Sequence, residues 1–480
     1  MASLRAEAIT LNPSPFTPRT LVPAVLAAAL LAGCANFSAD GGFGAIQSAT
    51  QSRIQKDVVW SRDEASRSQT QARIDALLAK PLSADDAVQV ALLNNPGLQA
   101  AFNTLGIAEA DRVAAQRLPN LVFTLGRLTR GSEVEWDRSL QFNLARLLTM
   151  PMRADIEQRL FEQTRRGLVL DVLRLAADTR KAWVVAVAAN QSAHYQQQAM
   201  EAAEAGAELG RRMQQAGNWS TLKQAREQAF YADAALAVAR AEQAKLQARE
   251  RLVRLLGLPN GDTLHLPDRL PDLPAALPAL PDVEQRAMTS RIDLQMTRLQ
   301  TEALARNLGL TRRTRFINVL ELGAISNSSN EVPLQRGYEI SFELPLFDWG
   351  QTRVVAAESR YRQALERARE TAVNARSEVR EAYAMQQSQY AIARQLRDEV
   401  VPLRQRISDE NLLRYNGMLI GVFELLADAR SQIAAVNAAI DAQRDFWLAD
   451  ADMQMALAGK PGKTALNPLS SAPADGAGGH

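Results

Sequence analysis

The sequence contains few of the residues on which disulfide frameworks, metal centres and most catalytic sites depend. It has one cysteine and three histidines in 480 residues, which excludes an internal disulfide and a cysteine-based metal cluster. The histidines, His194, His265 and His480, are far apart in the sequence, and the chain has neither an HExxH motif nor a Ser-His-Asp order. We therefore expect no enzyme, no resident metal and no other cofactor.

Aromatic residues, long apolar runs and an excess of one charge are also scarce. Aromatics make up 5% of the chain, and the bulk is Ala, Leu, Arg, Gln and Glu, a mixture typical of long helices that pack along narrow seams. No stretch of about 18 apolar residues occurs, so we expect no membrane-spanning helix in the mature chain. With 55 basic and 53 acidic residues, the chain is nearly neutral, which argues against a nucleic-acid partner.

The N-terminus has the pattern of an export signal. Basic residues precede the apolar run 21–32, which is too short to cross a bilayer. The run ends in LAGC, which resembles the lipobox of bacterial lipoproteins, where Cys34 is acylated and becomes the first mature residue. In lipoproteins that resemble this one, a residue other than Asp after the cysteine, here Ala35, favours sorting to the outer membrane. We expect a signal peptide at 1–33 and a palmitate-type anchor on Cys34.

A set of residues recurs at an offset of about 200 positions, which is the mark of a duplicated unit. The recurring pairs are Phe142 and Phe342, Arg153 and Arg353, Trp183 and Tyr383, and Gly217 and Gly417. Between the two copies lies a proline-rich stretch, which fits neither a helix nor a central strand and is expected to be extended. The expected segments are an N-terminal strap at 34–81, a first repeat at 82–256, the linker at 257–281, a second repeat at 282–459 and a disordered tail at 460–480.

Each repeat is expected to contain two amphipathic strands. The predicted strands are 121–125, 134–144, 317–326 and 337–346. In the last of them, Tyr338, Ile340 and Phe342 fall on one face, because side chains alternate along a strand. Four strands cannot close a barrel, and lipid tolerates no open sheet edge. The strands therefore either lie outside the membrane or share one barrel with other copies, where two copies supply eight strands and three supply twelve.

Long helical patterns make up most of the rest of both repeats. The predicted helices are 154–215, 220–256, 350–415 and 422–457, with shorter ones at 83–95, 97–117, 283–290 and 293–311. Gly217 and Gly417 are expected to mark the hairpin reversals, and Pro402 is expected to kink the third long helix. From Tyr361 to Val400, residues spaced alternately four and three apart are apolar or Gln, a heptad that predicts a left-handed coiled coil.

The order of elements in each repeat is a helix pair, a strand hairpin, a long helix, a Gly-marked reversal and a return helix. This duplicated order resembles that of the TolC-like outer-membrane factor family, lipoprotein subgroup. The resemblance is carried by LSADDAVQVALLNNPGLQAA at 82–101, FELPLFDWGQTR at 342–353 and YNGMLIGVFELLADAR at 415–430. It implies a mostly α fold with a membrane β-barrel contribution. Three chains would form one barrel of transmembrane strands in the outer membrane and one periplasmic tunnel of long α-helical coiled-coil hairpins.

The resemblance also implies a function and partners. The homotrimer would be a passive outer-membrane channel that exports small molecules such as drugs, organics or metal ions. Its partners would be outer-membrane lipid, a periplasmic adaptor (membrane fusion) protein and an inner-membrane pump. Two other interpretations stay open. One is the outer-membrane conduit of a type I protein secretion system, and the other is a periplasmic coiled-coil adaptor, which would have one helical hairpin where this chain has two.

Members of this family carry acidic residues that constrict the tunnel near its periplasmic end. By this resemblance, Glu424 is the candidate acid, and Asp428 lies four residues later on the same helix face. At an offset of 200, the equivalent positions in the first repeat are Gln224 and Gln228. Three chains would then form a ring of carboxylates that favours cations. The alternative is an ordinary solvated helix face.

Overall fold

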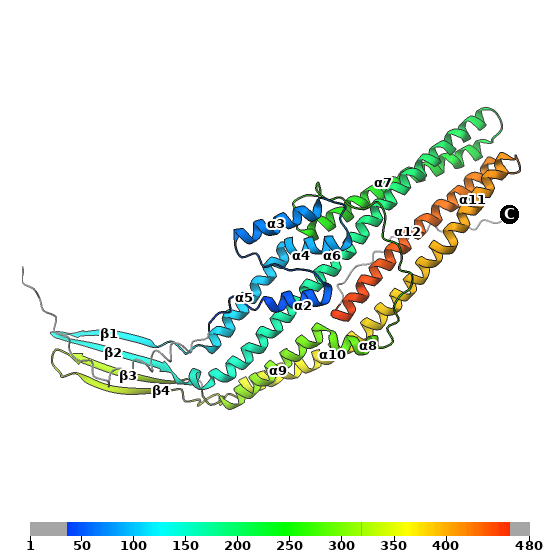
Figure 1. Cartoon of the computed structure of the whole chain (residues 1–480). Coiled ribbons are helices and arrows are strands. Elements are labelled where there is room, and N and C mark those ends of the chain that lie inside the picture. Colours follow the sequence, from blue (N-terminus) through cyan, green and yellow to red (C-terminus); the bar gives the residue numbers. More distant parts are fainter. Residues whose placement is uncertain (1–35, 318, 461–480) are drawn as a thin grey trace, which may run out of the picture. The chain divides into compact units, whose positions relative to one another are not determined.

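The computed structural model describes residues 36–317 and 319–460, so the predicted signal peptide, Cys34 and the predicted tail beyond Lys460 lie outside the described residues. The described chain is mainly helical (Figure 1). Its helices are α2 Gly44–Ile54, α3 Glu64–Leu78, α4 Ala84–Asn94, α5 Pro96–Gln116, α6 Leu144–Gln215, α7 Thr221–Leu256, α8 Val283–Ser290, α9 Ile292–Arg313, α10 Gln351–Gln395, α11 Val401–Asn416 and α12 Val422–Ala458. Its strands are β1 Val122–Arg130, β2 Glu133–Asn143, β3 Leu320–Ser329 and β4 Gln335–Phe342.

The chain divides into two compact units, and each takes segments from both predicted repeats. The sheet unit comprises the described residues 36–39, 109–158 and 306–357. The helical unit comprises 40–108, 159–305 and the described residues from 358 onward. None of the described helices combines the length and the apolar character that a bilayer crossing requires.

The sheet unit holds one antiparallel sheet in the order β1-β2-β3-β4. The central pairing joins β2 of the first repeat to β3 of the second, with Phe142 opposite Leu322. Residues that pair directly across an antiparallel ladder point to the same face. The predicted faces are thereby confirmed, because the apolar rows run across strands of both repeats. One row is Phe123, Leu140, Ala324 and Tyr338, and the next is Phe142, Leu322 and Ile340.

The opposite face of the sheet is mostly polar. Asp137, Asn327 and Gln335 form one of its rows, and Gln141, Gly323 and Glu339 form another. The apolar face, by contrast, is largely exposed in the single chain, with Tyr338 at 80% exposure. The sheet is therefore amphipathic, with an uncovered apolar face.

The ends of all four predicted strands need correction, and so does the start of one helix. Strand β1 continues to Arg130 instead of ending at 125, and β3 covers Leu320–Ser329 instead of 317–326. Strand β2 ends at Asn143 and α6 begins at Leu144, although the helix was expected from about residue 154. The Asn143 Oδ1 atom accepts a hydrogen bond of 2.7 Å from the Arg146 N–H, as an N-cap does. Strand β4 ends at Phe342 instead of residue 346, because Pro345 cannot donate a ladder hydrogen bond.

The turn that follows β4 needs its glycine. The Asp348 Oδ1 atom accepts a hydrogen bond of 2.9 Å from the Gly350 N–H. Gly350 has a φ of +76°, and a Cβ atom there would overlap the carbonyl oxygen of Arg315. The helix α10 then begins at Gln351, as the turn signals predict.

The helical unit begins with a segment that is more structured than the predicted strap. Residues 44–54 and 64–78 form α2 and α3. Phe43, Ile46, Ile74 and Leu78 are buried in two hydrophobic clusters of this unit. The helical period was missed because polar residues dominate both helices, so little apolar patterning remains to be recognised.

The predicted helix boundaries around residues 83–96 are confirmed. Ser83 caps α4, since its Oγ atom accepts a hydrogen bond of 3.1 Å from the Asp86 N–H. Pro96 ends α4 and opens α5. The linker at 257–281 contains no helix or strand, but Leu264, Leu270 and Leu273 are buried. It is therefore an extended segment packed onto the helices.

The predicted heptad appears in the third long helix, and a π-helical turn lies just before Pro402, where a kink was expected. Four of the five buried residues of α10, namely Ala375, Val379, Gln386 and Ala393, lie on the predicted stripe. The helix continues through a π-helical turn at Leu396–Val400 into α11. In that turn the Val401 N–H donates to the Leu396 carbonyl, because Pro402 has no N–H with which to continue the α-helical ladder.

Candidate functional site

The candidate site comprises the two hairpin tips of the helical unit, where α6 turns into α7 and α11 turns into α12 (Figure 1). At the first tip, Gly217 has a φ of +78°, and the Asn218 N–H donates to the Met213 carbonyl at 2.9 Å. This is the Schellman arrangement, which favours glycine at its left-handed position. The Ser220 Oγ atom then accepts a hydrogen bond of 3.3 Å from the Lys223 N–H and caps α7.

The second tip has the same hydrogen-bond pattern, but a different residue takes the left-handed position. The Leu419 N–H donates to the Arg414 carbonyl at 2.8 Å. Met418 has a φ of +59°, whereas Gly417 has a φ of −81°. The N-cap of α12 is Gly421, which has no side chain with which to cap. Gly417 therefore lies in the reversal without supplying its left-handed residue.

This difference changes the alignment of the two repeats at the site. The helices after the tips begin at Thr221 and Val422, so the offset here is 201 positions, one more than the 200 of the other matches. The residue equivalent to Glu424 is Lys223, and the residue equivalent to Asp428 is Glu227. The sequence-based choice of Gln224 and Gln228 is therefore wrong, because it carries the offset past an inserted residue.

The two candidate acids differ in their surroundings. Glu424 lies in the first turn of α12 and is exposed. Asp428 is half-buried, and its Oδ2 atom is buried without a hydrogen-bond partner among the described residues. Asp428 therefore has a shielded carboxylate oxygen, whereas Glu424 lies on a solvated face of the helix.

A buried ion pair joins the two hairpins beside these acids. The Arg430 guanidinium on α12 donates to the Glu227 carboxylate on α7 at 2.5 Å, and the Glu227 side chain is 1% exposed. The guanidinium carbon also lies 4.3 Å from the centre of the Phe230 ring. Charge-assisted contacts of this kind are strong, and they fix the orientation of both partners. The pair therefore ties the start of α12 to the start of α7.

Sequence reasoning missed this ion pair. Glu227 lies against two glycines of α6, since Cβ atoms added at Gly206 and Gly210 would lie 3.7 Å and 3.5 Å from its side chain. The glycines thus permit close approach of α6 to its neighbours. An offset of 201 positions could have identified Glu227 from the sequence, because it aligns Glu227 with Asp428, so that both repeats have an acidic residue at this position.

An exposed carboxylate at the first tip is held by two arginines. The Glu208 carboxylate accepts hydrogen bonds of 2.7 Å from both Arg211 and Arg212. These hydrogen bonds lower the pKa of Glu208 to about 2. The last turns of α6 therefore carry a cluster that is charged at any physiological pH.

The tips combine an ion pair between two helices with an exposed carboxylate held by arginines. Among the described residues, no three His, Cys, Asp or Glu side chains lie close enough together to hold a metal ion. The second tip also exposes apolar residues, with Met418 at 93% and Leu419 at 78% exposure. Such residues are typical of a surface that another molecule covers.

Comparisons with known proteins were made on both sequence and structure. No protein-family model matches the chain, and no curated protein matches it. The open state of the Neisseria gonorrhoeae MtrE outer membrane channel matches it with a TM-score of 0.65 at 20% identity, over 78% of this chain and 88% of that one. The outer-membrane channel OprN matches with a TM-score of 0.66 at 19% identity, over 86% and 95% of the two chains.

A third structure gives the same result. The outer membrane protein VceC from Vibrio cholerae matches with a TM-score of 0.64 at 16% identity, over 83% of this chain and 98% of that one. In each case the match covers most of both chains, although at most about a fifth of the residues are identical. The chain therefore has the fold of these outer-membrane channels.

Proposed function

We propose that this chain is the subunit of a trimeric outer-membrane channel of a tripartite efflux system, a passive conduit for small molecules. Its fold is that of MtrE and OprN, whose structures are described as outer-membrane channels. A periplasmic adaptor and an inner-membrane pump would complete the system. The exposed apolar residues Met418 and Leu419 at the second tip give such a partner a surface to cover.

The observation that carries this proposal is the amphipathic sheet. Its apolar rows are exposed in the single chain, and among the described residues β1 and β4 pair with a strand on one side only. Unpaired backbone groups cost several kcal/mol each in lipid, so the two edges need strands from other copies. Three copies supply twelve strands, enough for a barrel that surrounds a lumen.

Aromatic residues beside the sheet support its place in a membrane. Phe316, Phe347 and Trp349 lie next to the ends of β3 and β4, and all three are exposed. Phe316 and Trp349 meet edge to face, with ring centres 6.1 Å apart. Aromatic rings of this kind gather at the boundary between lipid and water.

Ion currents test the proposal directly. The purified full chain, added to planar lipid bilayers, should give discrete conductance steps, and native mass spectrometry of the same sample should give a trimer. A variant with Tyr338→Glu, Ile340→Glu and Phe342→Glu places charges on the apolar face and should lose insertion while its helix content stays unchanged. A monomer without conductance would refute the channel.

We also propose Glu424 and Asp428 as the acids of the periplasmic aperture. Their contribution is tested by the double variant Glu424→Ala with Asp428→Ala, which should raise conductance or reduce the preference for cations. The matched control is Glu201→Ala with Glu204→Ala, which removes the same charge from exposed positions on α6. Equal currents from wild type and the aperture variant would reject these two residues.

The lipid anchor is proposed on sequence grounds. Acylation of Cys34 would add a membrane anchor of about 0.8 kcal/mol per buried methylene group. Mass spectrometry of the mature protein should find the lipid on an N-terminal Cys34, and Cys34→Ser should remove it. An unmodified Cys34 within a longer mature chain would contradict both the anchor and the predicted signal peptide at 1–33.

A further inference from the structure

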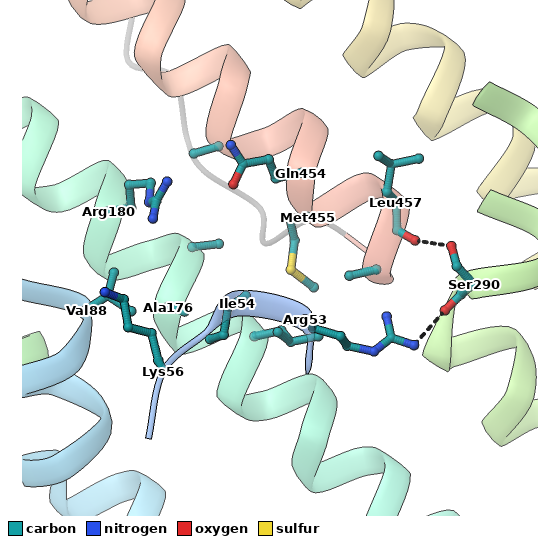
Figure 2. Close-up of a pocket in the computed structure, with 14 residues that line it drawn as sticks. Arg53, Ile54, Lys56, Val88, Ala176, Arg180, Ser290, Gln454, Met455 and Leu457 are labelled. Carbon is teal, nitrogen blue, oxygen red and sulfur yellow. Dashed lines mark hydrogen bonds between the residues drawn. The ribbon is translucent and has the colours of Figure 1, made fainter. Parts of the chain in front are cut away.

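The helical unit contains a cavity that the proposed channel function does not use. It has a volume of about 410 Å³ and is lined by fourteen residues (Figure 2). The lining comes from the end of α2 and from α4, α6, α8 and α12. About 300–1,000 Å³ is the usual range for sites that bind small molecules, so the space suits a small ligand.

The charge of the lining is one-sided. Arg53, Lys56 and Arg180 line the cavity, and none of the fourteen residues is acidic. Burial lowers the pKa of Arg53, and the nearby Arg166 guanidinium lowers it further. Arg53 is nevertheless exposed, whereas Lys56 and Arg180 are half-buried, and a half-buried cation is stabilised when an anion lies beside it.

The three cations differ in the hydrogen bonds and ion pairs that they form with other residues. Arg180 donates to the Asp85 carboxylate at 2.5 Å, which lies outside the lining. Arg53 donates to the Ser290 carbonyl at 3.2 Å, an interaction drawn in Figure 2. For Lys56, the described part of the chain provides neither a hydrogen bond nor an ion pair, although the side chain is half-buried. Its ammonium group therefore has three donors for a ligand.

The backbone places Lys56 in the cavity wall at a conformational cost. The preceding residue, Gln55, ends α2 with a φ of +54° and a ψ of +38°, in the left-handed region. A residue other than glycine seldom adopts this conformation, and strain of this kind is concentrated where function requires it. The turn brings the end of α2 against α6 and α12 (Figure 2).

The rest of the wall is mostly apolar, with Ser290 and Gln454 as its neutral polar residues. Val88, Leu173, Met455 and Leu457 belong to it, together with several alanines. Two carbonyl groups at the nearby helix ends accept hydrogen bonds. The Ser290 Oγ atom donates to the Leu457 carbonyl at 2.8 Å, and Arg53 donates to the Ser290 carbonyl. The negative end of α8 thus takes up part of the charge of Arg53, which leaves Lys56 as the cation of the lining without a partner among the described residues.

We propose that this cavity binds a small amphiphilic monoanion, namely a carboxylate with a short alkyl or aryl body. Lys56 binds the carboxylate, the Arg53 and Arg180 side chains add positive potential to the lining, and the mostly apolar wall from α4, α6 and α12 covers the body. Every residue involved belongs to the helical unit, and none of them is one of the acids proposed for the aperture, so this site can be tested separately from the channel.

The test compares three probes of equal chain length: octanoate, octanol and octylammonium. Each is titrated by calorimetry into the full chain in lipid nanodiscs, and the heats for empty nanodiscs are subtracted. Octanoate should bind, and the other two should bind at least about tenfold more weakly, because only the carboxylate gains charge-assisted hydrogen bonds. Equal binding of octanoate and octanol would overturn the proposal.

Variants distinguish binding at this site from nonspecific binding. Lys56→Gln should weaken octanoate about tenfold, Lys56→Arg should restore it, and Ala177→Leu should block the body by filling the cavity. The matched control is Lys80→Gln, an exposed lysine 3.6 Å from Asp86 that is absent from the lining. Each variant is first checked for unchanged helix content. Unaltered binding by Lys56→Gln, or equal loss in Lys80→Gln, would refute the site.

One competing occupant lies within the chain itself. The residues beyond Lys460 follow directly on the end of α12, whose Ala458 lines the cavity. A chain that ends at Lys460 should bind octanoate as the full chain does. Binding by the shortened chain alone would assign the cavity to the tail and overturn the proposal.

Discussion

The two hairpin tips of the helical unit have the same hydrogen-bond pattern, but they differ in the residues at the left-handed position and at the helix N-cap. The first tip places Gly217 at its left-handed position and caps α7 with Ser220. The second tip places Met418 at the left-handed position, and its N-cap, Gly421, offers no side chain. The first tip is thus built from residues that favour its geometry, and the second adopts the same geometry against local preference.

This comparison identifies the second tip as the one held by tertiary contacts. Its left-handed residue is strained and almost fully exposed, and the turn itself gains little from its own sequence. The buried pair of Arg430 with Glu227 instead fastens the start of α12 to the first hairpin. If the aperture opens by movement of one hairpin, the second is the one whose local structure resists movement least.

The largest effect is expected from the ion pair. Arg430→Ala leaves the Glu227 carboxylate buried and unpaired, which costs about 3–5 kcal/mol. The second tip should then separate from the first, so channel conductance should rise in planar bilayers and amide hydrogen exchange should speed up in residues 417–430. The comparison of the tips would fail if exchange increased equally at 213–221.

A double variant sharpens this prediction. Glu227→Gln with Arg430→Met removes both charges together and should recover most of the lost stability, since no isolated charge stays buried. Arg362→Ala serves as the control, because it removes an exposed pair with Glu358. Exposed pairs contribute about 0–1 kcal/mol, so this control should change thermal unfolding little.

The glycines of the two tips should respond differently to the same substitution. Gly217→Ala forces a Cβ atom into the left-handed region and should cost about 1–2 kcal/mol. Gly417→Ala should be nearly neutral, since its φ of −81° suits alanine and the added Cβ would lie at an ordinary 3.5 Å from the Leu413 carbonyl. Thermal unfolding and local hydrogen exchange measure both. A larger cost at Gly417 would contradict the backbone assignment.

Relief of the strain at the second tip gives the converse test. Met418→Gly should stabilise the second tip by up to about 1 kcal/mol, because glycine adopts the left-handed conformation without steric cost. Slower hydrogen exchange in residues 413–421 is the expected observation. Faster exchange there would mean that the Met418 side chain, although exposed in the single chain, is covered by a stabilising contact in the trimer.

Changes to the helix caps should alter the free energy of unfolding by a smaller amount. Ser220→Ala should cost about 1 kcal/mol, because the Lys223 N–H loses its acceptor. Gly421→Ser should add a few tenths of a kcal/mol, roughly 0.3, since the new hydroxyl can serve the first turn of α12 and a Cβ atom there meets open space. The two changes together should bring the stabilities of α7 and α12 closer, as measured by hydrogen exchange.

The smallest effect concerns pH at the first tip. The pKa of Glu208 is lowered to about 2 by hydrogen bonds from Arg211 and Arg212. A carboxyl group with a lowered pKa stabilises the folded state above its ordinary pKa, and this contribution is lost as the pH falls through the folded value. Glu208→Gln should therefore lower the unfolding temperature slightly at pH 7 and less as the pH falls from about 4.5 towards 2. A constant difference over that range would contradict the role of the charge.

Much of the fold was predictable from local patterns. The boundaries of α7 and α8, the alternating face of β4 and the change of helical geometry before Pro402 follow from caps, alternation and proline chemistry, all of which act within a few residues. The predictions failed where a local signal was weak or misleading. Polar composition hid α2 and α3, and Pro151 suggested a late start for α6, although it lies only seven residues beyond the first residue of that helix.

The candidate site was predictable only in part. Gly217, Gly417, Glu424 and Asp428 were found by repetition and resemblance, whereas Glu227 was missed. Its contact with Arg430 joins residues 203 positions apart, a separation at which no periodicity carries information. The fixed offset also failed at the tip, since one additional residue shifts every later equivalence by one place.

The sequence by itself determined the duplicated order of elements, the apolar and polar faces of the strands and the heptad stripe of α10. These depend on the chemistry of neighbouring residues. Only the tertiary structure decided that β2 of one repeat pairs with β3 of the other, that Glu227 and Arg430 meet in a buried pair, and that Arg53 and Lys56 line one cavity. The physical reason is that such contacts depend on how distant segments pack, which the local chemistry of either segment leaves open.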